Sequence, residues 1–150
     1  MNKPINIINK KAKFEYQLLD QYKAGIVLTG TEIKSIRLSK ASISESFCEF
    51  NYNNELFIIN MFIDEYEFGN HHNHKTKSQR KLLLNKKELR KLNKDVKNTG
   101  LTIVPLKVFI NEKGFAKVLI SLAKGKKTFD KRQVIKDRES KIQLDRLKKI

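Results

Sequence analysis

Hydrophobic and polar residues alternate over much of residues 14–123, with the two-residue period that is typical of β-strands. Apolar and β-branched runs separated by turn residues predict six strands, over residues 14–20, 23–29, 41–50, 55–63, 101–110 and 114–123. We expect the first two to form a hairpin with a turn of two or three residues, and the last two to form a hairpin through the sequence NEKG. Ile43 and Phe47 are expected to point inward, and Pro105, which lacks an amide proton, should lie at an edge or a bulge.

Two other stretches repeat their apolar residues with a helical period. Thr29 precedes Glu32 by three positions, which is a capping-box pattern, and predicts a helix over residues 31–38 with Ile33 and Ile36 on one side. Asn85 and Glu88 repeat the pattern and predict a second helix, whose inner face carries Leu89, Leu92 and Val96. Residues 69–80 contain no apolar side chain and therefore predict a surface loop.

The order of these elements predicts the fold class. Short strands dominate and helices are inserted at only a few places, which favours a mainly β fold: an OB-like, antiparallel, six-stranded β-barrel with two to three short helices over residues 1–123. Residues 124–150 form a separate basic tail with eleven basic and four acidic residues. Their apolar residues scatter around a helical wheel, so we expect this tail to be disordered alone and helical only on a partner.

The charge of the chain restricts its function. The 32 Lys and Arg residues against 16 Asp and Glu give a net charge of +16, which indicates a polyanionic partner. The chain has no apolar run of membrane-spanning length and no cationic-apolar leader, so we expect a soluble cytoplasmic protein without membrane contact. The single cysteine, Cys48, lies in a strand-like run and is interpreted as a small packed residue.

Two candidate chemical sites were weighed against plain structural interpretations. His71, His72 and His74 are clustered, but no cysteine or carboxylate lies at a fixed spacing from them, so we predict no metal site. The sequence DEYE offers three carboxylates (Asp64, Glu65 and Glu67) for a magnesium-dependent nuclease, but alternate strand residues face opposite ways and a solvated strand end is favoured. No phosphate-binding loop or nucleophile motif occurs, so we predict neither an enzyme nor a cofactor.

Basic residues concentrate at three places, residues 9–14, residues 75–87 and the tail. Clusters of this kind repel one another unless a polyanion neutralises them, which favours nucleic-acid binding. The sequence lacks the aromatic pattern of an RRM, the GXXG loop of a KH domain and a helix-turn-helix. An OB-like barrel that recognises folded RNA by its shape and its phosphates remains.

Six motifs in one order identify a family. The stretches are NKKAKFEY (9–16), AGIVLTGTEIKSIR (24–37), KASISES (40–46), RKLLLNKKEL (80–89), GLTIVPLKVF (100–109) and AKGKKTFDKR (123–132). Together they resemble the SmpB family of SsrA-binding proteins, the small partners of bacterial transfer-messenger RNA, over nearly the whole chain. The resemblance implies an OB-like barrel that binds the tRNA-like domain of this RNA and replaces its missing anticodon arm.

The resemblance also implies the partners. The protein with its RNA enters the empty A site of a ribosome stalled on a broken message, so that the nascent chain is tagged and the ribosome is rescued. The expected partners are therefore transfer-messenger RNA and the ribosome, at the small-subunit decoding centre, the mRNA path and 16S rRNA, with one monomer per RNA. The alternative is a constitutive ribosomal or RNA-chaperone protein of the same fold without a preferred RNA.

The motifs and the basic clusters give a list of candidate residues. Predicted RNA-binding residues are Lys10, Lys11, Lys13, Glu32, Lys34, Arg80, Lys81, Leu83, Asn85, Lys124, Lys126 and Lys127. Predicted ribosome-contacting residues in the tail are Asp130, Lys131, Arg132, Lys136 and Arg138. Glu32 and Lys34 in GTEIKS, Leu83 and Asn85 in RKLLLN, and the DKR of the tail follow from the resemblance; Glu32 is also expected to cap its helix.

Overall fold

The computed structural model describes residues 5–98 and 100–126. Its elements follow one another as β1 (Asn6–Ile8), α1 (Ala12–Glu15), β2 (Tyr16–Ile26), α2 (Gly30–Arg37), β3 (Ala41–Ser42), β4 (Phe47–Phe50), β5 (Leu56–Ile59), β6 (Phe62–Ile63), the short 3-10 helix η1 (Asn70–His72), β7 (Arg80–Leu83), α3 (Lys86–Val96), β8 (Leu101–Ile110) and β9 (Ala116–Gly125). None of the helices in this described part is long and apolar enough to span a membrane.

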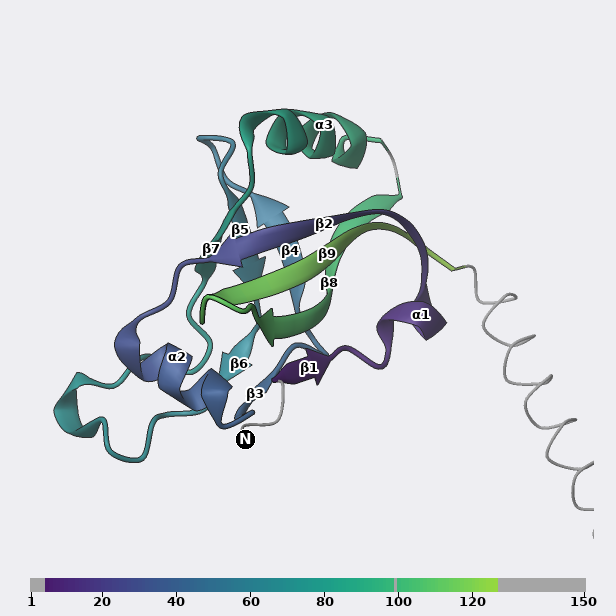
Figure 1. The fold of residues 1–150 in the computed structure, drawn as a ribbon. Helices are drawn as coiled ribbons and strands as arrows, with labels where there is room; N and C mark the ends of the chain where they lie inside the picture. The colour runs from purple at the N-terminus through teal and green to yellow at the C-terminus, as the bar shows by residue number, and fades with distance from the viewer. Residues whose placement is uncertain (1–4, 99, 127–150) are drawn as a thin grey trace, which may run out of the picture.

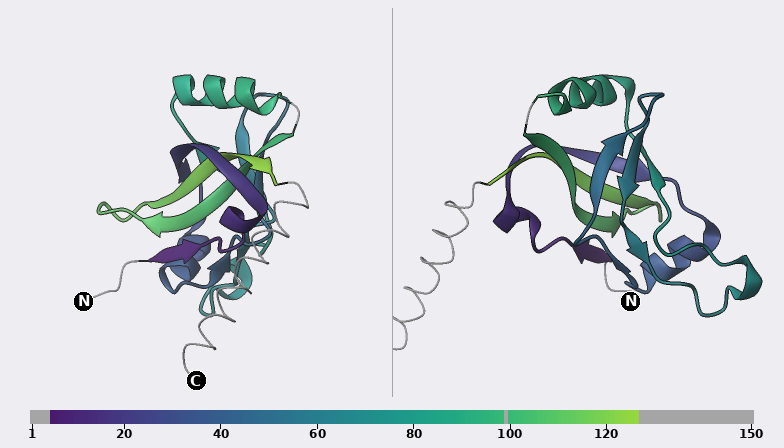
Figure 2. Two further views of the ribbon diagram at one scale, coloured as in Figure 1. Left: turned by 90° about the vertical axis from the view of Figure 1, so that its right-hand side faces the viewer. Right: turned by 180° about the vertical axis from the view of Figure 1, so that it is seen from behind.

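Six antiparallel strands close into a ring. Their order is β8-β4-β5-β7-β2-β9, and the ring closes because β9 pairs with both β2 and β8 (Figure 1). Strand β1 adds to the outside of β8, while β3 and β6 form a separate pair. Helix α3 lies at one end of the ring, and α2 lies at the opposite end in every view (Figures 1 and 2). The predicted fold class, mainly β with an OB-like arrangement of six strands, is confirmed.

Apolar side chains from the strands fill the inside of the ring. Leu56, Ile58, Ile103 and Ile120 have no exposed surface, and Ile36 of α2 and Leu92 of α3 complete the same core from its two ends. Cys48 packs there as a small residue, and burial raises the pKa of its thiol well above the usual range. The two helices therefore act as lids on the ring, which fixes the residues at their N-termini relative to the strands.

The predicted hairpin over residues 14–29 is wrong. Residues Tyr16–Ile26 form one strand of 11 residues, and its pairing with β9 shifts register between Leu18 and Gln21. An irregularity of this kind changes which face a side chain points to, and so interrupts the alternation along the sequence in the same way as a turn. The hydrophobic pattern alone could not separate the two cases.

Two other predicted strands are split, and two strands, β1 and β7, were missed. The run 41–50 divides into β3 and β4, where Ile43 is buried, Phe47 is half-buried and Cys48 is the residue that points inward. The run 55–63 divides at Asn60, which has a positive φ of 60° and ends β5 before β6 begins. Strand β7 takes the sixth place in the ring and pairs with β5. It was missed because polar residues precede it in the sequence.

Several predictions of local structure are confirmed. Both helices begin with the expected capping boxes, Thr29 with Glu32 and Asn85 with Glu88. The last hairpin joins β8 and β9, and its register shifts next to Pro105, which is the bulge that the missing amide proton predicts. Strand β9 continues to Gly125, two residues beyond the predicted end of the folded part.

Candidate nucleic-acid interface

A buried ion pair joins the two motifs that carry half of the predicted RNA contacts. Glu32 begins α2 and Arg80 begins β7, and the Arg80 Nε donates to the Glu32 carboxylate. The two residues are only 4% and 3% exposed. The other Glu32 oxygen accepts from the backbone N–H of Thr29 at 2.9 Å, so the helix cap and the ion pair use one carboxylate.

Arg80 also holds the polar loop that precedes it. Its Nη1 donates to the carbonyl of Met61 at 2.7 Å, and its Nη2 donates to the carbonyls of Lys75 and Thr76 at 3.1 and 3.2 Å. Guanidinium donors that bind carbonyls in this way satisfy backbone groups that the polar loop leaves open. The end of the predicted surface loop is therefore fixed to the core. Arg80, the last residue of that loop, was predicted at the surface but is buried.

His74 attaches the same loop to α2. Its Nε2 donates to the carbonyl of Ile63 at 3.0 Å, so its Nδ1 accepts the hydroxyl proton of Thr31 in the neutral ring, at 2.9 Å. Asn73 adds two hydrogen bonds to the backbone of Tyr66. No periodic pattern in the sequence predicts these anchors, because they lie in a loop and act one residue at a time.

Lys34 lies on the open side of the same helix. Its side chain is exposed, and its Nζ lies 5.4 Å from the centre of the Tyr66 ring. It is therefore free to contact an anion, in contrast to Glu32 two residues earlier. Direct RNA contact fits the exposure of Lys34 but does not fit Glu32 and Arg80, whose burial makes them the framework behind the surface.

Leu83 is the exposed member of a run of three leucines. Leu82 is 1% exposed and belongs to the core, whereas Leu83 is 51% exposed on the outer face of β7. Leu83 is paired with Gly25 of β2, and Gly25 is paired in turn with Lys117 of β9. Since Gly25 has no side chain, Leu83 and Lys117 meet across it: a Cβ at this position would lie 3.5 Å from Leu83 Cβ and 3.6 Å from Lys117 Nζ. An apolar and a basic side chain therefore lie next to each other, which suits a nucleobase and its phosphate.

Asn85 joins this outer face to α3. Its side-chain oxygen accepts from the backbone N–H of Glu88 at 2.8 Å, while the residue as a whole is exposed. Lys81, two residues before Leu83, is half-buried and forms an ion pair with Glu55. The charge of Lys81 is therefore already paired within the protein, whereas about half of the Leu83 side chain stays open to solvent.

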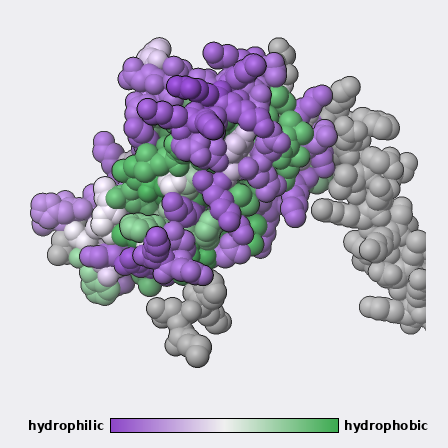
Figure 3. Space-filling model, turned by 45° about the horizontal axis from the view of Figure 1, so that its top comes forward, coloured by the Kyte–Doolittle hydropathy of each residue, from purple (hydrophilic) through white to green (hydrophobic). Residues whose placement is uncertain are grey.

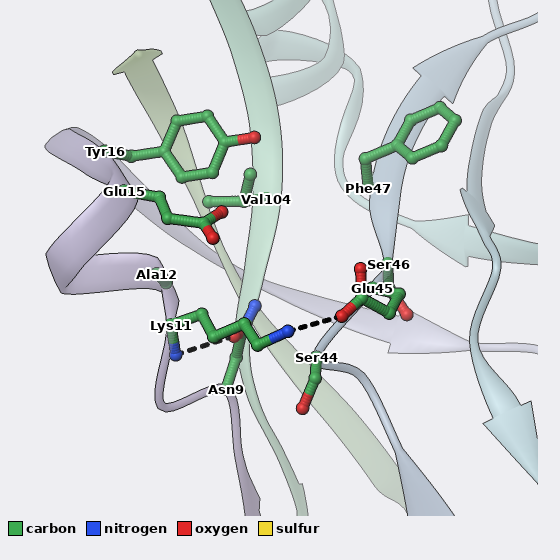
Figure 4. A pocket seen from close by; sticks show the side chains of 10 residues that line it. All are labelled: Asn9, Lys11, Ala12, Glu15, Tyr16, Ser44, Glu45, Ser46, Phe47 and Val104. Carbon is green, nitrogen blue, oxygen red and sulfur yellow. Dashed lines mark hydrogen bonds and ion pairs between the residues drawn. The ribbon is translucent and has the colours of Figure 1, made fainter. Parts of the chain in front are cut away.

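Lys11, one of the N-terminal candidates, lines a pocket of about 100 Å³ between α1 and the segment before β4 (Figure 4). Lys11 forms an ion pair with Glu45 at 2.6 Å across its rim, and this hydrogen bond raises the pKa of Lys11. Lys10 and Lys13 are exposed. Below them, the buried Asn9 donates to the carbonyl of Pro105 at 3.0 Å and fixes the segment to β8.

The end of β9 lies beside α1. The Lys126 N–H donates to the carbonyl of Glu15, and the Lys126 Nζ donates to the carbonyl of Lys13, both at 3.0 Å. Lys124, two residues earlier, is exposed. The structure thus brings Lys124 and Lys126 together with the N-terminal lysines. Leu83 belongs to another strand, β7.

The other tail candidates are outside the described residues. These are Lys127, Asp130, Lys131, Arg132, Lys136 and Arg138. The residues of the two rejected sites are described: Asp64, Glu65 and Glu67 are exposed, and His74 is used as a loop anchor. Across residues 5–98 and 100–126, no group of three His, Cys, Asp or Glu side chains is arranged to hold a metal ion.

Comparisons with known proteins give the same family as the motifs. A family model described as SmpB protein matches residues 6–150. An SsrA-binding protein of Flavobacterium psychrophilum is 66% identical over 149 residues, which are 99% of each chain. The chain belongs to the SmpB family. More distant SmpB-family relatives include the SsrA-binding proteins of Bacteroides thetaiotaomicron, 54% identical over 95% of each chain, and Agrobacterium fabrum, 48% identical over 94% of this chain and 88% of the relative.

A solved SmpB chain is also similar in structure. It is described as "tmRNA-SmpB: a journey to the center of the bacterial ribosome" and superposes with a TM-score of 0.71. The two chains are 43% identical, and the match covers 87% of this chain and 94% of the solved one. The ring of strands and its helices are therefore the fold of the SmpB family.

Proposed function

We propose that this protein is a non-enzymatic adaptor that binds transfer-messenger RNA and brings it to stalled ribosomes. The observation that carries the proposal is its similarity, over 87% of its length, to a solved chain described together with tmRNA and the bacterial ribosome. The net charge of +16 supports it, because a polyanion is needed to neutralise such a surface. An adaptor of this kind works in the cytoplasm, as one monomer per RNA.

The outer face around Leu83 is the proposed contact for the tRNA-like domain. Leu83 and Asn85 supply an apolar and a polar surface for unpaired bases, and the exposed Lys34 supplies charge for phosphates. Lys81 would contact a phosphate by exchanging its ion pair with Glu55 for one with the RNA. Glu32 and Arg80 hold α2 and β7 in register behind this face. In this proposal the N-terminal lysines Lys10, Lys11 and Lys13 extend the contact with RNA phosphates.

The basic tail is the proposed ribosome-binding element. Its residues Asp130, Lys131, Arg132, Lys136 and Arg138 would contact 16S rRNA in the decoding centre and along the mRNA path. Lys124 and Lys126 precede this element and, with Lys127, are proposed as RNA contacts. We place the boundary after Lys126, because Gly125 still pairs with Tyr16 and the Lys126 N–H donates to Glu15.

Sequencing the RNA that is purified with the protein tests the first part of the proposal. One dominant small RNA with a tRNA-like end is the expected result. A uniform profile of ribosomal RNA would instead indicate a constitutive ribosomal or RNA-chaperone protein. The measurement needs the full chain, because both the outer face and the tail carry charge.

Removal of residues 127–150 tests the second part. The truncated protein retains β9 and its contacts with β2 and α1, so it should fold and keep most of its affinity for the isolated tRNA-like RNA. Tagging of stalled nascent chains should be lost. Intact tagging would refute the role of the tail, and a large loss of affinity for the isolated RNA would refute the role of the folded part.

A further inference from the structure

An exposed tyrosine lies in the turn between β4 and β5. Tyr52 has 104% of its reference surface exposed, which is the largest value among the exposed apolar and aromatic side chains of the described residues. A tyrosine ring carries a large apolar area that is usually buried against other side chains. In Tyr52 this apolar area is in contact with water. An aromatic ring that extends from a basic RNA-binding protein is a platform on which a base can stack.

The turn that carries Tyr52 is held firmly. The Asn51 side-chain oxygen accepts from the backbone N–H groups of Asn53 and Glu55, at 3.0 and 2.9 Å. The Asn51 N–H also donates to the Glu55 carbonyl at 2.9 Å, which closes the turn. Stacking on a fixed ring costs less conformational entropy than stacking on a mobile loop.

The same turn is tied to α3. The Asn93 side chain donates to the Asn54 side-chain oxygen at 3.0 Å, and Asn54 lies two residues after Tyr52. A hollow of about 250 Å³ lies at this junction, lined by Asn54, Lys86, Leu89, Arg90 and Asn93. The turn lies beside α3 at one end of the ring (Figures 1 and 2).

Cations without partners surround this hollow. Lys86 and Arg90 are exposed, and neither forms an ion pair among the described residues. The nearby carboxylates are occupied, Glu55 by Lys81 and Glu88 by the cap of α3. Figure 3, which looks onto this end of the molecule, shows hydrophilic side chains spread over it. The local field therefore attracts anions.

We propose that Tyr52 and this hollow form an accessory binding site for an unpaired RNA nucleotide. The base stacks on the Tyr52 ring, the amides of Asn54 and Asn93 face its polar edge, and Lys86 and Arg90 bind the flanking phosphates. The site continues the proposed RNA contact, because α3 starts directly after Leu83 and Asn85. The inference rests on the proposed function, since it names a further part of the RNA surface.

The test compares the full chain with Tyr52→Ala, Tyr52→Phe and the double variant Lys86→Ala/Arg90→Ala. The probes are a short fluorescent oligoadenylate, the same oligomer annealed into a duplex, and the tRNA-like domain of transfer-messenger RNA. We expect Tyr52→Ala to weaken oligoadenylate binding about five- to tenfold, while Tyr52→Phe, which keeps the ring, stays within about twofold. Tyr52→Ala should change duplex binding by less than about twofold, because paired bases are already stacked.

The double variant should lower the salt dependence of oligoadenylate binding. Each lost phosphate contact reduces the slope of log K against log salt by about 0.7 for single strands. Lys113→Ala is the matched control: Lys113 is an exposed lysine in the turn between β8 and β9, and its loss should affect neither Tyr52-dependent binding nor the preference for single strands. Thermal unfolding should be the same for all these variants, since every changed side chain is exposed.

The outcomes separate the inference from the function on which it rests. Equal oligoadenylate affinity of the unchanged protein and Tyr52→Ala would overturn the inference, as would an equal loss in Tyr52→Ala and Tyr52→Phe. Failure of the proposed function is a different result, in which the unchanged protein binds the tRNA-like domain no more tightly than an unrelated folded RNA. The preference for the tRNA-like domain is measured on the unchanged protein alone, so it does not depend on Tyr52.

Discussion

Helices α2 and α3 start with the same local motif at opposite ends of the ring, but they are used differently. In α2 the glutamate of the capping box, Glu32, is buried and shared with Arg80. In α3 the corresponding Glu88 is half-exposed, and its helix presents unpaired cations to solvent. The start of α2 therefore belongs to the buried framework, and the start of α3 belongs to the surface. A capping box therefore sets where a helix begins but does not determine its role in binding.

The largest effect is expected from Glu32→Ala. The change leaves the Arg80 guanidinium buried without its counter-charge, which costs about 3–5 kcal/mol of unfolding free energy. Glu88→Ala is the matched control at the other helix and should cost about 1 kcal/mol or less. Urea denaturation followed by circular dichroism measures both. Similar losses for the two variants would contradict the distinction between the two helix starts.

Neighbouring leucines in β7 separate stability from binding. Leu82→Ala removes a core side chain and should cost about 2–4 kcal/mol of unfolding free energy. Leu83→Ala should change stability by less than about 1 kcal/mol and weaken binding of the tRNA-like RNA about five- to tenfold. Denaturation and fluorescence anisotropy on the same samples measure the two quantities. A loss of stability without a loss of affinity in Leu83→Ala would show that its exposed surface is not an RNA contact.

The smallest effect is expected for the partly exposed ion pair between Lys81 and Glu55. The Lys81 side chain lowers the pKa of Glu55 by hydrogen bonding to its carboxylate, and Asn51 adds to this. A carboxylate with a lowered folded-state pKa contributes stability that is fully present above its unfolded pKa, near 4.5, and lost as the pH falls through its folded value. The unchanged protein should therefore lose more stability between about pH 6 and pH 3 than Glu55→Gln does.

The control for this prediction is ionic strength. Because the Lys81–Glu55 pair is partly exposed, high salt should reduce the difference between the unchanged protein and Glu55→Gln at neutral pH. The buried Glu32–Arg80 pair should respond much less to salt. Identical pH profiles for the two proteins would show that Glu55 gains nothing from its partners.

Local signals predicted part of the fold correctly. The starts of α2 and α3, the β8–β9 hairpin and the bulge at Pro105 each depend on residues a few positions apart, so the sequence contains them in full. The predicted hairpin over 14–29 failed because an irregularity inside β2 changes the alternation in the same way as a turn. Strand β7 was missed because only its pairing with β2 and β5 makes it a strand.

The candidate site shows the same division. Leu83 and Asn85 were found through a motif, and the structure places both on the surface. Arg80 was predicted as a surface contact from the basic cluster over residues 75–87, whereas it is 3% exposed. Tyr52 had no motif and no periodic signal, because its exposure depends on the turn between β4 and β5 and on α3 beside it.

The helix starts, most strand-forming runs and the strong positive charge can be read from the amino-acid sequence, because they depend on residues a few positions apart and on composition. The family follows from the six motifs. The contact between Glu32 and Arg80, 48 positions apart, and the closure of the ring by the pairing of β9 with β2 emerge only when the chain is folded. Burial and long-range pairing depend on how distant segments pack together, so a side chain such as Arg80 can look like a surface cation in the sequence and still belong to the core.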